Sequence, residues 1–317
     1  MTTTTLARRV LSAVRRRVHL PVLEDVPATY RAAIFVAGSG RSGTTWLSEL
    51  LIAGTRRRYL FEPLSRNVAI TTPFHRDFVK RYLRPDADEP ELREIMDRVL
   101  SGQIRSRWTE RFNRRLRTHG RVVKEIRANL MLGWLQATFP GLPVILMLRH
   151  PCAVAASFAR EGWRGRVGEM LAQPELVRDH LNGAQCDVLV ELERSPLFER
   201  AIGIWCVETM VALRQMRRGA YVLCYESLLT APAYQLGKLF AWLERSDVAA
   251  AIERVARPSS TSRGDRITAP RLTAWQRELT GVQIARALEV VKAFDLDMLY
   301  GAGPLPDLRV PLEPWLS

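Results

Sequence analysis

The chain has 317 residues, of which 47% are hydrophobic and 25% charged, a balance typical of a globular protein with a buried core. No apolar run approaches the roughly 20 residues of a membrane-spanning helix, and the basic N-terminus lacks the apolar segment and small-residue cleavage site of a secretory signal. These features argue against a membrane-spanning or secreted protein, and we expect a cytoplasmic one.

The formal net charge of +14 would suit nucleic acid, an anionic membrane or small anionic ligands. Only four of the 47 basic residues are lysines, and the arginines are spread along the whole chain. A nucleic-acid-binding protein more often concentrates its basic residues on one face or one arm. We therefore expect no nucleic-acid partner.

Neither a disulfide framework nor a metal site is expected. None of the cysteines forms a C-x-x-C pair, and the five histidines are scattered without the spacing of metal ligands. Reduced thiols in apolar or helical stretches are the expectation. The cysteines are Cys152, Cys186, Cys206 and Cys224.

Residues 1–30 are expected to form a separate arm. Leu6, Val10, Val14 and Val18 recur every four residues with arginines between them, which is the pattern of a basic amphipathic helix. Two interpretations remain open. The helix packs against the edge of the domain, which the short stripe favours, or it lies on an anionic membrane surface and makes the protein peripherally membrane-associated.

From residue 31 onward, short apolar runs alternate with helical patterns. This alternation predicts an α/β fold, a parallel sheet flanked by helices, with a helical C-terminal half. We expect one domain over residues 31–301 and a tail over 302–317. The predicted strands are 32–37, 121–124, 144–148 and 220–225, and the predicted helices are 44–53, 90–117, 129–139, 152–160, 174–193 and 198–218.

The strongest motif is the segment 38–46, GSGRSGTTW, between the strand at 32–37 and the helix at 44–53. In that setting the backbone N–H groups of the loop and the positive end of the helix both favour an anion. Gly40 and Gly43 allow a tight turn and close approach to the ligand. Ser42, Thr44 and Thr45 add hydroxyl and amide donors.

The motif departs from a nucleoside-triphosphatase loop, which reads G-x-x-x-x-G-K-[ST]. Gly38 and Gly43 have the right spacing, but threonine stands at position 44 and the cation lies inside the loop, as Arg41. The usual lysine and an obvious acidic partner for Mg²⁺ are missing, which argues against ATP or GTP hydrolysis.

The segment 41–45, RSGTT, resembles the 5′-phosphosulfate loop of sulfotransferases that depend on 3′-phosphoadenosine 5′-phosphosulfate (PAPS). Cytosolic members have lysine where Arg41 stands, whereas tyrosylprotein and Golgi carbohydrate sulfotransferases have arginine. The resemblance implies a P-loop-like sulfotransferase fold with PAPS as donor and no metal.

A second anion site is needed for the 3′-phosphate of PAPS. Arg149 follows the strand at 144–148, and Ser157 comes eight residues later on the next helix, which resembles the family's 3′-phosphate motif. An arginine gives charge-assisted hydrogen bonds and a serine adds one donor. Together the two motifs suit a ligand with anions at both ends of one nucleoside.

Two weaker matches add candidate cofactor-binding residues. Tyr225 opens a YESLL segment that resembles the family's Y-E-D-L segment, although a tyrosine buried at a strand end is an equal alternative. Ser262 and Arg263 lie in a segment, 259–264, that resembles the one closing over the 3′-phosphate. A solvated surface loop is the alternative there.

Sulfonate transfer requires an in-line acceptor, a base and charge for the leaving group. Arg41 is the candidate for stabilising the leaving phosphate. Glu62, in the segment FEPL at 61–64, is the candidate base, and carbohydrate sulfotransferases have a similar glutamate in an E-P-L context. The alternative is a glutamate paired with Arg57, Arg58 or Arg66.

Aryl and steroid sulfotransferases use a histidine in a K-T-H segment, and this chain has KEI at 124–126 instead. Lys124 and Arg127 are candidates for contacting the sulfonate or the acceptor, with surface ion pairing, notably to Glu125, as the alternative. Trp163, in a segment rich in glycine and arginine, is a candidate acceptor wall or part of a mobile loop.

The sequence thus predicts sulfonate transfer from PAPS to a hydroxyl, with a carbohydrate or glycolipid as acceptor by resemblance to the E-P-L subgroup. The alternatives are an ATP-dependent P-loop kinase and a catalytically inactive nucleotide-binding adaptor.

Overall fold

The computed structural model describes residues 24–75, 77–113, 115–163, 165–216, 220–262 and 272–307. The N-terminal arm as far as residue 23, Arg263 and the end of the C-terminal tail therefore lie outside the described residues, and so does the stripe on which the amphipathic-helix prediction depends. Within the described ranges, no helix is long and apolar enough to cross a membrane.

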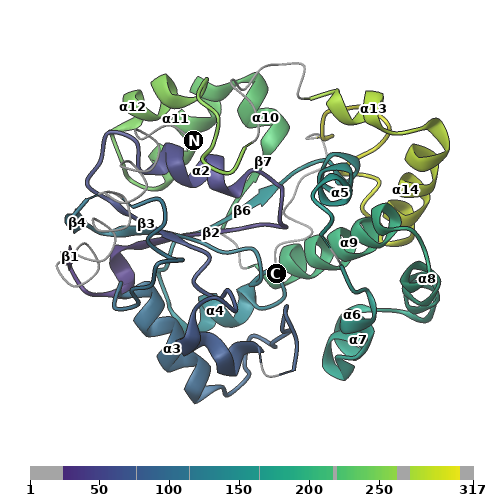
Figure 1. Cartoon of the computed structure of the whole chain (residues 1–317), viewed down its shortest axis with the longest axis horizontal. Helices are drawn as coiled ribbons and strands as arrows, with labels where there is room; N and C mark the ends of the chain where they lie inside the picture. The colour runs from purple at the N-terminus through teal and green to yellow at the C-terminus, as the bar shows by residue number, and fades with distance from the viewer. Residues whose placement is uncertain are drawn as a thin grey trace, which may run out of the picture.

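The core is a five-stranded sheet in which every strand pairs parallel to its neighbours, in the order β3-β5-β2-β6-β7 (Figure 1). The central strand β2 places Phe35 beside Val123 of β5 and Val144 of β6. The strands are β2 (Ala33–Ala37), β3 (Arg58–Phe61), β5 (Arg121–Lys124), β6 (Val144–Leu148) and β7 (Tyr221–Cys224).

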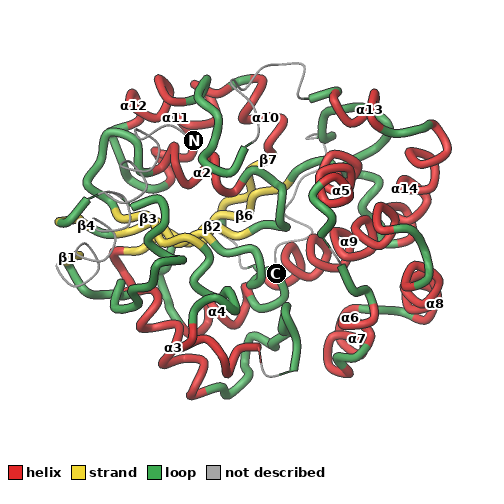
Figure 2. The backbone as a smooth tube through the Cα atoms, in the orientation of Figure 1, coloured by secondary structure: helices red, strands yellow, loops and turns green. Residues whose placement is uncertain are grey.

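Helices cover both faces of the sheet, as Figure 2 shows, and this confirms the predicted α/β class. The helices are α2 (Thr44–Leu51), α3 (Pro90–Leu100), α4 (Leu132–Thr138), α5 (Pro151–Arg160), α6 (Gly168–Leu171), α7 (Pro174–His180), α8 (Gly183–Glu193), α9 (Leu197–Gln215), α10 (Tyr225–Thr230), α11 (Pro232–Trp242), α12 (Val248–Arg254), α13 (Ala274–Glu278) and α14 (Gly281–Ala293), with 3₁₀ turns η1 (Tyr30–Ala32) and η2 (Ala69–His75).

Alternating residues of the central strand point into two separate apolar cores. Phe35 and Ala37 belong to the larger core, on the side of α3, α4, α5 and α9, whereas Ile34 and Val36 belong to the smaller one, beneath α2 and α11. Every residue of β2 is buried because both faces are covered. The continuous apolar run at 32–37 predicted this burial.

Three predicted elements have different limits in the structure. The helix expected over 90–117 ends at Leu100, because Gly102 takes a left-handed φ of 76° and the chain turns. The helix expected over 174–193 is broken between α7 and α8, where Asn182 caps the second helix with a capping box. Tyr225 begins α10 and does not end a strand.

Strand β3 and a small two-stranded sheet were not predicted. Strand β3 pairs with β5 at the edge of the main sheet, while β1 (Glu24–Val26) pairs parallel with β4 (Arg117–His119). Strands β1 and β4 have three residues each and no apolar run by which a strand could be recognised in the sequence.

Two fully buried arginines join these strands to the rest of the domain. Arg121 of β5 donates from Nε to Asp25 Oδ2 at 2.7 Å, and Arg58 of β3 donates to the carbonyl of Gly102 at 2.5 Å and to Glu110 Oε1 at 2.6 Å. Buried cations of this kind are stable only when paired and hydrogen-bonded. The network therefore fixes the backbone of β1, β3 and the turns that follow α3.

Removal of the shared carboxylate should destabilise the fold. Asp25→Ala leaves Arg58 and Arg121 short of a buried counterion, and we expect the free energy of unfolding to fall by about 3 kcal/mol or more. Urea denaturation followed by circular dichroism measures this. The exposed Asp88→Ala is the control and should stay within about 0.5 kcal/mol of the parent. Equal effects of the two changes would contradict the structural role of the network.

Candidate active site

The glycine-rich loop joins β2 to α2 in a conformation that requires glycine. Gly43 has a φ of 95° and caps α2, and a Cβ built on it would lie 2.6 Å from the Tyr225 ring. A Cβ on Gly40 would lie 2.7 Å from the ring of Trp163. The loop also holds Arg41 at a φ of 70°. Thr44 and Thr45 form the first turn of α2, whose N–H groups open toward the carboxyl edge of the sheet.

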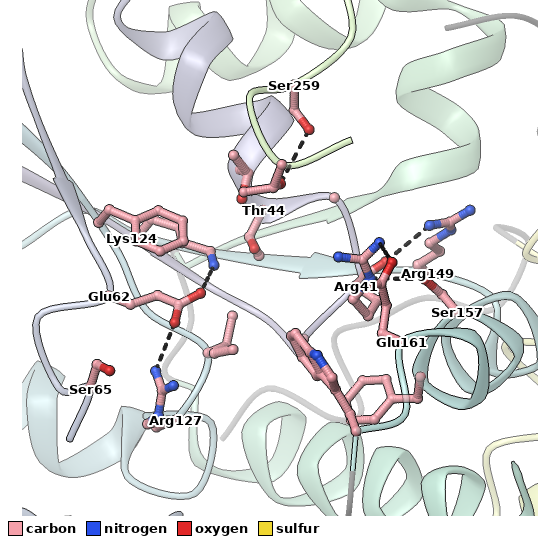
Figure 3. A pocket seen from close by; sticks show the side chains of 18 of the residues that line it. Arg41, Thr44, Glu62, Ser65, Lys124, Arg127, Arg149, Ser157, Glu161 and Ser259 are labelled. Carbon is pink, nitrogen blue, oxygen red and sulfur yellow. Dashed lines mark hydrogen bonds and ion pairs between the residues drawn. The ribbon is translucent and has the colours of Figure 1, made fainter. Parts of the chain in front are cut away.

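The structure brings the two arginine motifs together (Figure 3). Arg41 Nε donates to Ser157 Oγ at 2.8 Å, and Arg149 Nη1 donates to the Arg41 carbonyl at 3.0 Å. Glu161 Oε1 lies 3.8 Å from Arg41 Nη2. Loops that follow β2 and β6 thus meet at one edge of the sheet, as two anion sites for a single nucleotide require.

Polar atoms in this cluster fit a bound phosphate group. Ser42 Oγ and Arg149 Nε are buried, and neither has a hydrogen-bond partner among the described residues. Buried donors normally find a partner, and an anion would supply one to each. The residues that PAPS would need on its phosphate groups are therefore of the right type and in one place.

Tyr225 lies beneath this cluster. Its ring is 4.4 Å from the Arg149 guanidinium carbon and 5.4 Å from the Trp46 ring, and its side chain is buried. Ser262 Oγ lies 2.8 Å from Ser259 Oγ, and both serines line the same cavity. Arg263, which follows Ser262 in the sequence, is outside the described residues.

Glu62 occupies the other side of the cavity, directly after β3. Its Oε1 accepts from Lys124 Nζ at 2.5 Å and its Oε2 from Arg127 Nη1 at 3.1 Å. The backbone N–H of Glu62 donates to the Lys124 carbonyl at 2.8 Å, and its φ is 43°. The Glu62 carboxylate is thus held by these two cations. The alternative was a pairing of Glu62 with Arg57, Arg58 or Arg66. It is wrong for Arg58, whose partners are Asp25 and Glu110.

Burial and charge oppose each other at this carboxylate. Burial alone would raise the pKa of Glu62, but the Lys124 ammonium and the Arg127 guanidinium outweigh it and lower that pKa. Burial lowers the pKa of Lys124, against the pull of Glu62. Lys124 is only 4% exposed, so the alternative of a surface ion pair is wrong for this residue. Arg127 does pair with Glu125, at 3.0 Å.

One cavity of about 1160 Å³ connects the two clusters. The glycine loop, Arg149 and Ser157 line one part, and Glu62, Lys124 and Arg127 line another. Trp163 lies on the side of the arginine cluster: its ring is 5.7 Å from the Arg41 guanidinium carbon and packs edge-on against Phe158. The other aromatic side chains in the lining are Phe61, Trp108, Phe112, Trp46 and Tyr225.

Sequence reasoning missed residues that hold the loop from behind. Glu208 accepts from Ser39 Oγ at 2.5 Å and pairs with Lys80, and Asn129 Oδ1 accepts from the Gly38 N–H at 3.0 Å. Glu208 is buried in the middle of α9. A carboxylate inside an apolar helical stretch was a signal that could have drawn attention to it.

A parallel α/β sheet whose carboxyl edge carries a glycine loop, a helix N-terminus and converging arginines defines a class of proteins that bind phosphate-bearing ligands at that edge. The sequence pattern of the Sulfotransferase family matches residues 33–247. The chain belongs to the sulfotransferase family, and it is a sulfotransferase enzyme.

The chain is also similar to several solved structures, at low sequence identity. The sulfotransferase domain from the curacin biosynthetic pathway is 16% identical over 83% of this chain and 96% of its own, with a TM-score of 0.47. Retinol dehydratase in complex with androsterone and the inactive cofactor PAP is 15% identical over 86% and 83%, with a TM-score of 0.45. Mouse sulfotransferase SULT7A1 complexed with PAP is 12% identical over 94% of both chains, with a TM-score of 0.41. No curated protein matches the chain.

A methyl group on Gly43 should strain the loop. Gly43→Ala puts a Cβ at a left-handed φ and against Tyr225, so we expect a loss of about 1–3 kcal/mol in the free energy of unfolding. Gly237→Ala is the matched control: this glycine lies inside α11 with nothing within 4 Å of its added Cβ, and the change should stabilise by about 0.5–1 kcal/mol. Urea denaturation of both variants measures the difference, and the same sign for both would refute the strain.

Proposed function

We propose that this sulfotransferase transfers the sulfonate group to a hydroxyl of a carbohydrate or glycolipid, by in-line displacement with Glu62 as the base. The observation that carries the proposal is the shared cavity, in which a carboxylate held by two cations faces the arginine cluster that follows β2 and β6. PAPS supplies the activated sulfonate, with adenosine 3′,5′-bisphosphate (PAP) as the leaving product.

The donor would be held by the loop and by the two arginine motifs. In this proposal the backbone N–H groups from Gly40 to Thr45 and the Ser42 hydroxyl bind the 5′-phosphate, with Arg41 balancing the charge that develops there. Arg149 and Ser157 bind the 3′-phosphate. Tyr225 supports Arg149 from below, and Ser262 with Arg263 would close over the same phosphate.

Glu62 has the protonation state that a base needs. Because its pKa is lowered, the carboxylate is ionised at neutral pH and can accept the proton of an acceptor hydroxyl. A weak base of this kind takes the proton late, as the new O–S bond makes the hydroxyl more acidic. Lys124 has three N–H donors, one of which serves Glu62, so another can serve a sulfonate oxygen.

The aromatic walls of the cavity support a sugar as acceptor. Phe61, Trp108 and Phe112 lie on the Glu62 side, and Trp163 lies opposite near Arg41. Aromatic faces combine apolar contact with nearby polar groups, which suits the C–H faces and hydroxyls of a sugar ring. The E-P-L context of Glu62 points to the same acceptor class by resemblance.

Two substitutions should separate donor binding from catalysis. Glu62→Gln should lower kcat for sulfonate transfer by about 10²–10⁴ and leave the thermal stabilisation by PAP unchanged, because the base contacts only the acceptor. Arg149→Met should weaken the PAP-induced shift. Exposed Glu94→Gln is the control for both readouts. Transfer is followed as PAP release with a panel of glycosides and glycolipids, in the presence of EDTA.

Each contrary result has a distinct meaning. If Glu62→Gln retains transfer activity, Glu62 is not the base. Stabilisation by Mg-ATP without any by PAP would favour a P-loop kinase. Binding of PAP without transfer to any acceptor would favour an inactive adaptor.

The pH dependence of kcat/KM should report the same carboxylate. Because the Glu62 pKa is lowered, the acidic limb of the profile should lie below the ordinary glutamate value, and transfer should lose less to Glu62 protonation at acidic pH than it would with an unperturbed glutamate. Lys124→Met removes one cation while burial remains, so the Glu62 pKa should rise and the limb should move to higher pH. A limb that stays in place in this variant would show that another group governs it.

A further inference from the structure

The rim of the cavity near Glu62 carries a cation that contacts three aromatic rings. The guanidinium carbon of Arg111 lies 4.4 Å from the Trp108 centroid and 5.3 Å from those of Phe61 and Phe112. All four residues line the cavity. We propose that Arg111 binds an anionic group of the acceptor, so that the enzyme prefers sugars that carry a carboxylate or a phosphate. This inference rests on the proposed function, because it takes this part of the cavity as the acceptor site.

The hydrogen-bonding edge of Arg111 is available to a ligand. Across the described ranges no carboxylate lies within ion-pair distance of its guanidinium, whose recorded contacts are the three rings. A cation–π contact supplies no hydrogen-bond acceptor to the N–H groups of a guanidinium, so these donors stay available to an anion. These donors form a planar fork that matches the oxygens of a carboxylate or a phosphate.

The segment that carries Arg111 is fixed in position. Arg58, buried in β3, donates to the carbonyls of Gly102 at 2.5 Å and Ile104 at 2.6 Å and to Glu110 Oε1 at 2.6 Å. The Phe61 N–H donates to the Thr109 carbonyl at 3.0 Å. A fixed backbone keeps the three rings, and the Arg111 guanidinium near them, in place before a ligand arrives, which reduces the entropy cost of binding.

Charges elsewhere in the cavity are already paired. Glu62 is held by Lys124 and Arg127, and Lys80 pairs with Glu208. The groups that remain for an acceptor anion are Arg111 and, on the opposite side, Arg166. No ring contact is recorded for Arg166 within the part of the chain that the structure describes, so its guanidinium is not oriented in the same way.

The position of Arg111 relative to the base sets the size of the acceptor. The same Phe61 ring lies 4.6 Å from Lys124 Nζ and 5.3 Å from the Arg111 guanidinium carbon. Lys124 in turn holds Glu62. Because both cations contact the same ring, the anion and the reacting hydroxyl would lie close enough together for a single monosaccharide unit to carry both. A uronic acid or a sugar phosphate fits this requirement.

The test measures binding to the protein saturated with PAP, so it does not depend on turnover. The probes are phenyl β-D-glucuronide, phenyl β-D-glucoside and the 6-phosphate of that glucoside, which differ in the anion alone. We expect isothermal titration calorimetry to give a Kd for at least one anionic probe about tenfold or more below that of the neutral glucoside. The better of the two anionic probes distinguishes a carboxylate from a phosphate.

Three variants then locate the preference. Arg111→Gln should reduce the ratio of the Kd values to about one, whereas Arg105→Gln, an exposed arginine of the same segment that does not line the cavity, and Arg166→Gln should keep it. Equal affinities of the parent for charged and neutral probes, including no binding of either, would overturn the inference, and so would a ratio lost in Arg166→Gln and kept in Arg111→Gln. Failure of PAP itself to bind would instead contradict the proposed function.

Discussion

The parallel arrangement of the sheet is the constraint on which the candidate active site depends. Strands β2, β3, β5 and β6 all end at one edge, and a candidate site residue lies at or soon after each end: Arg41, Glu62, Lys124 and Arg149. In an antiparallel sheet half of these ends would lie on the opposite side. Residues more than a hundred positions apart in the chain therefore meet in one cavity without any long loop to bring them there.

Opposing electrostatic effects define the chemistry of that edge. Taking the Glu62 carboxylate out of water disfavours its charge, and the adjacent Lys124 and Arg127 restore it. The result is an ionised carboxylate that stays oriented by two hydrogen bonds. Such a group is poorly basic but well positioned, a combination suited to a reaction in which the acceptor becomes acidic only as the new bond forms.

Rigidity comes from buried polar groups behind the cavity. Glu208 and Asn129 hold the glycine loop through Ser39 and Gly38, while Arg58 holds the segment that carries the aromatic rim. A buried polar group costs free energy when it lacks a hydrogen-bond partner. Displacement of the loop would remove such a partner, so it is unfavourable. The site is thus oriented by interactions that never face the ligand.

The sequence by itself determined the central strands, the phosphate-type loop around Arg41 and the second arginine motif at Arg149, because these signals are local: an apolar run, a glycine pattern and a fixed spacing before a helix. Only the tertiary structure decided that Lys124 is buried against Glu62, that the helix begun at Pro90 stops at Leu100, and that Arg111 reaches the cavity. The physical reason is that the burial and pairing of these side chains depend on strand order and on which segments pack together, and neither is recorded in the spacing of neighbouring residues.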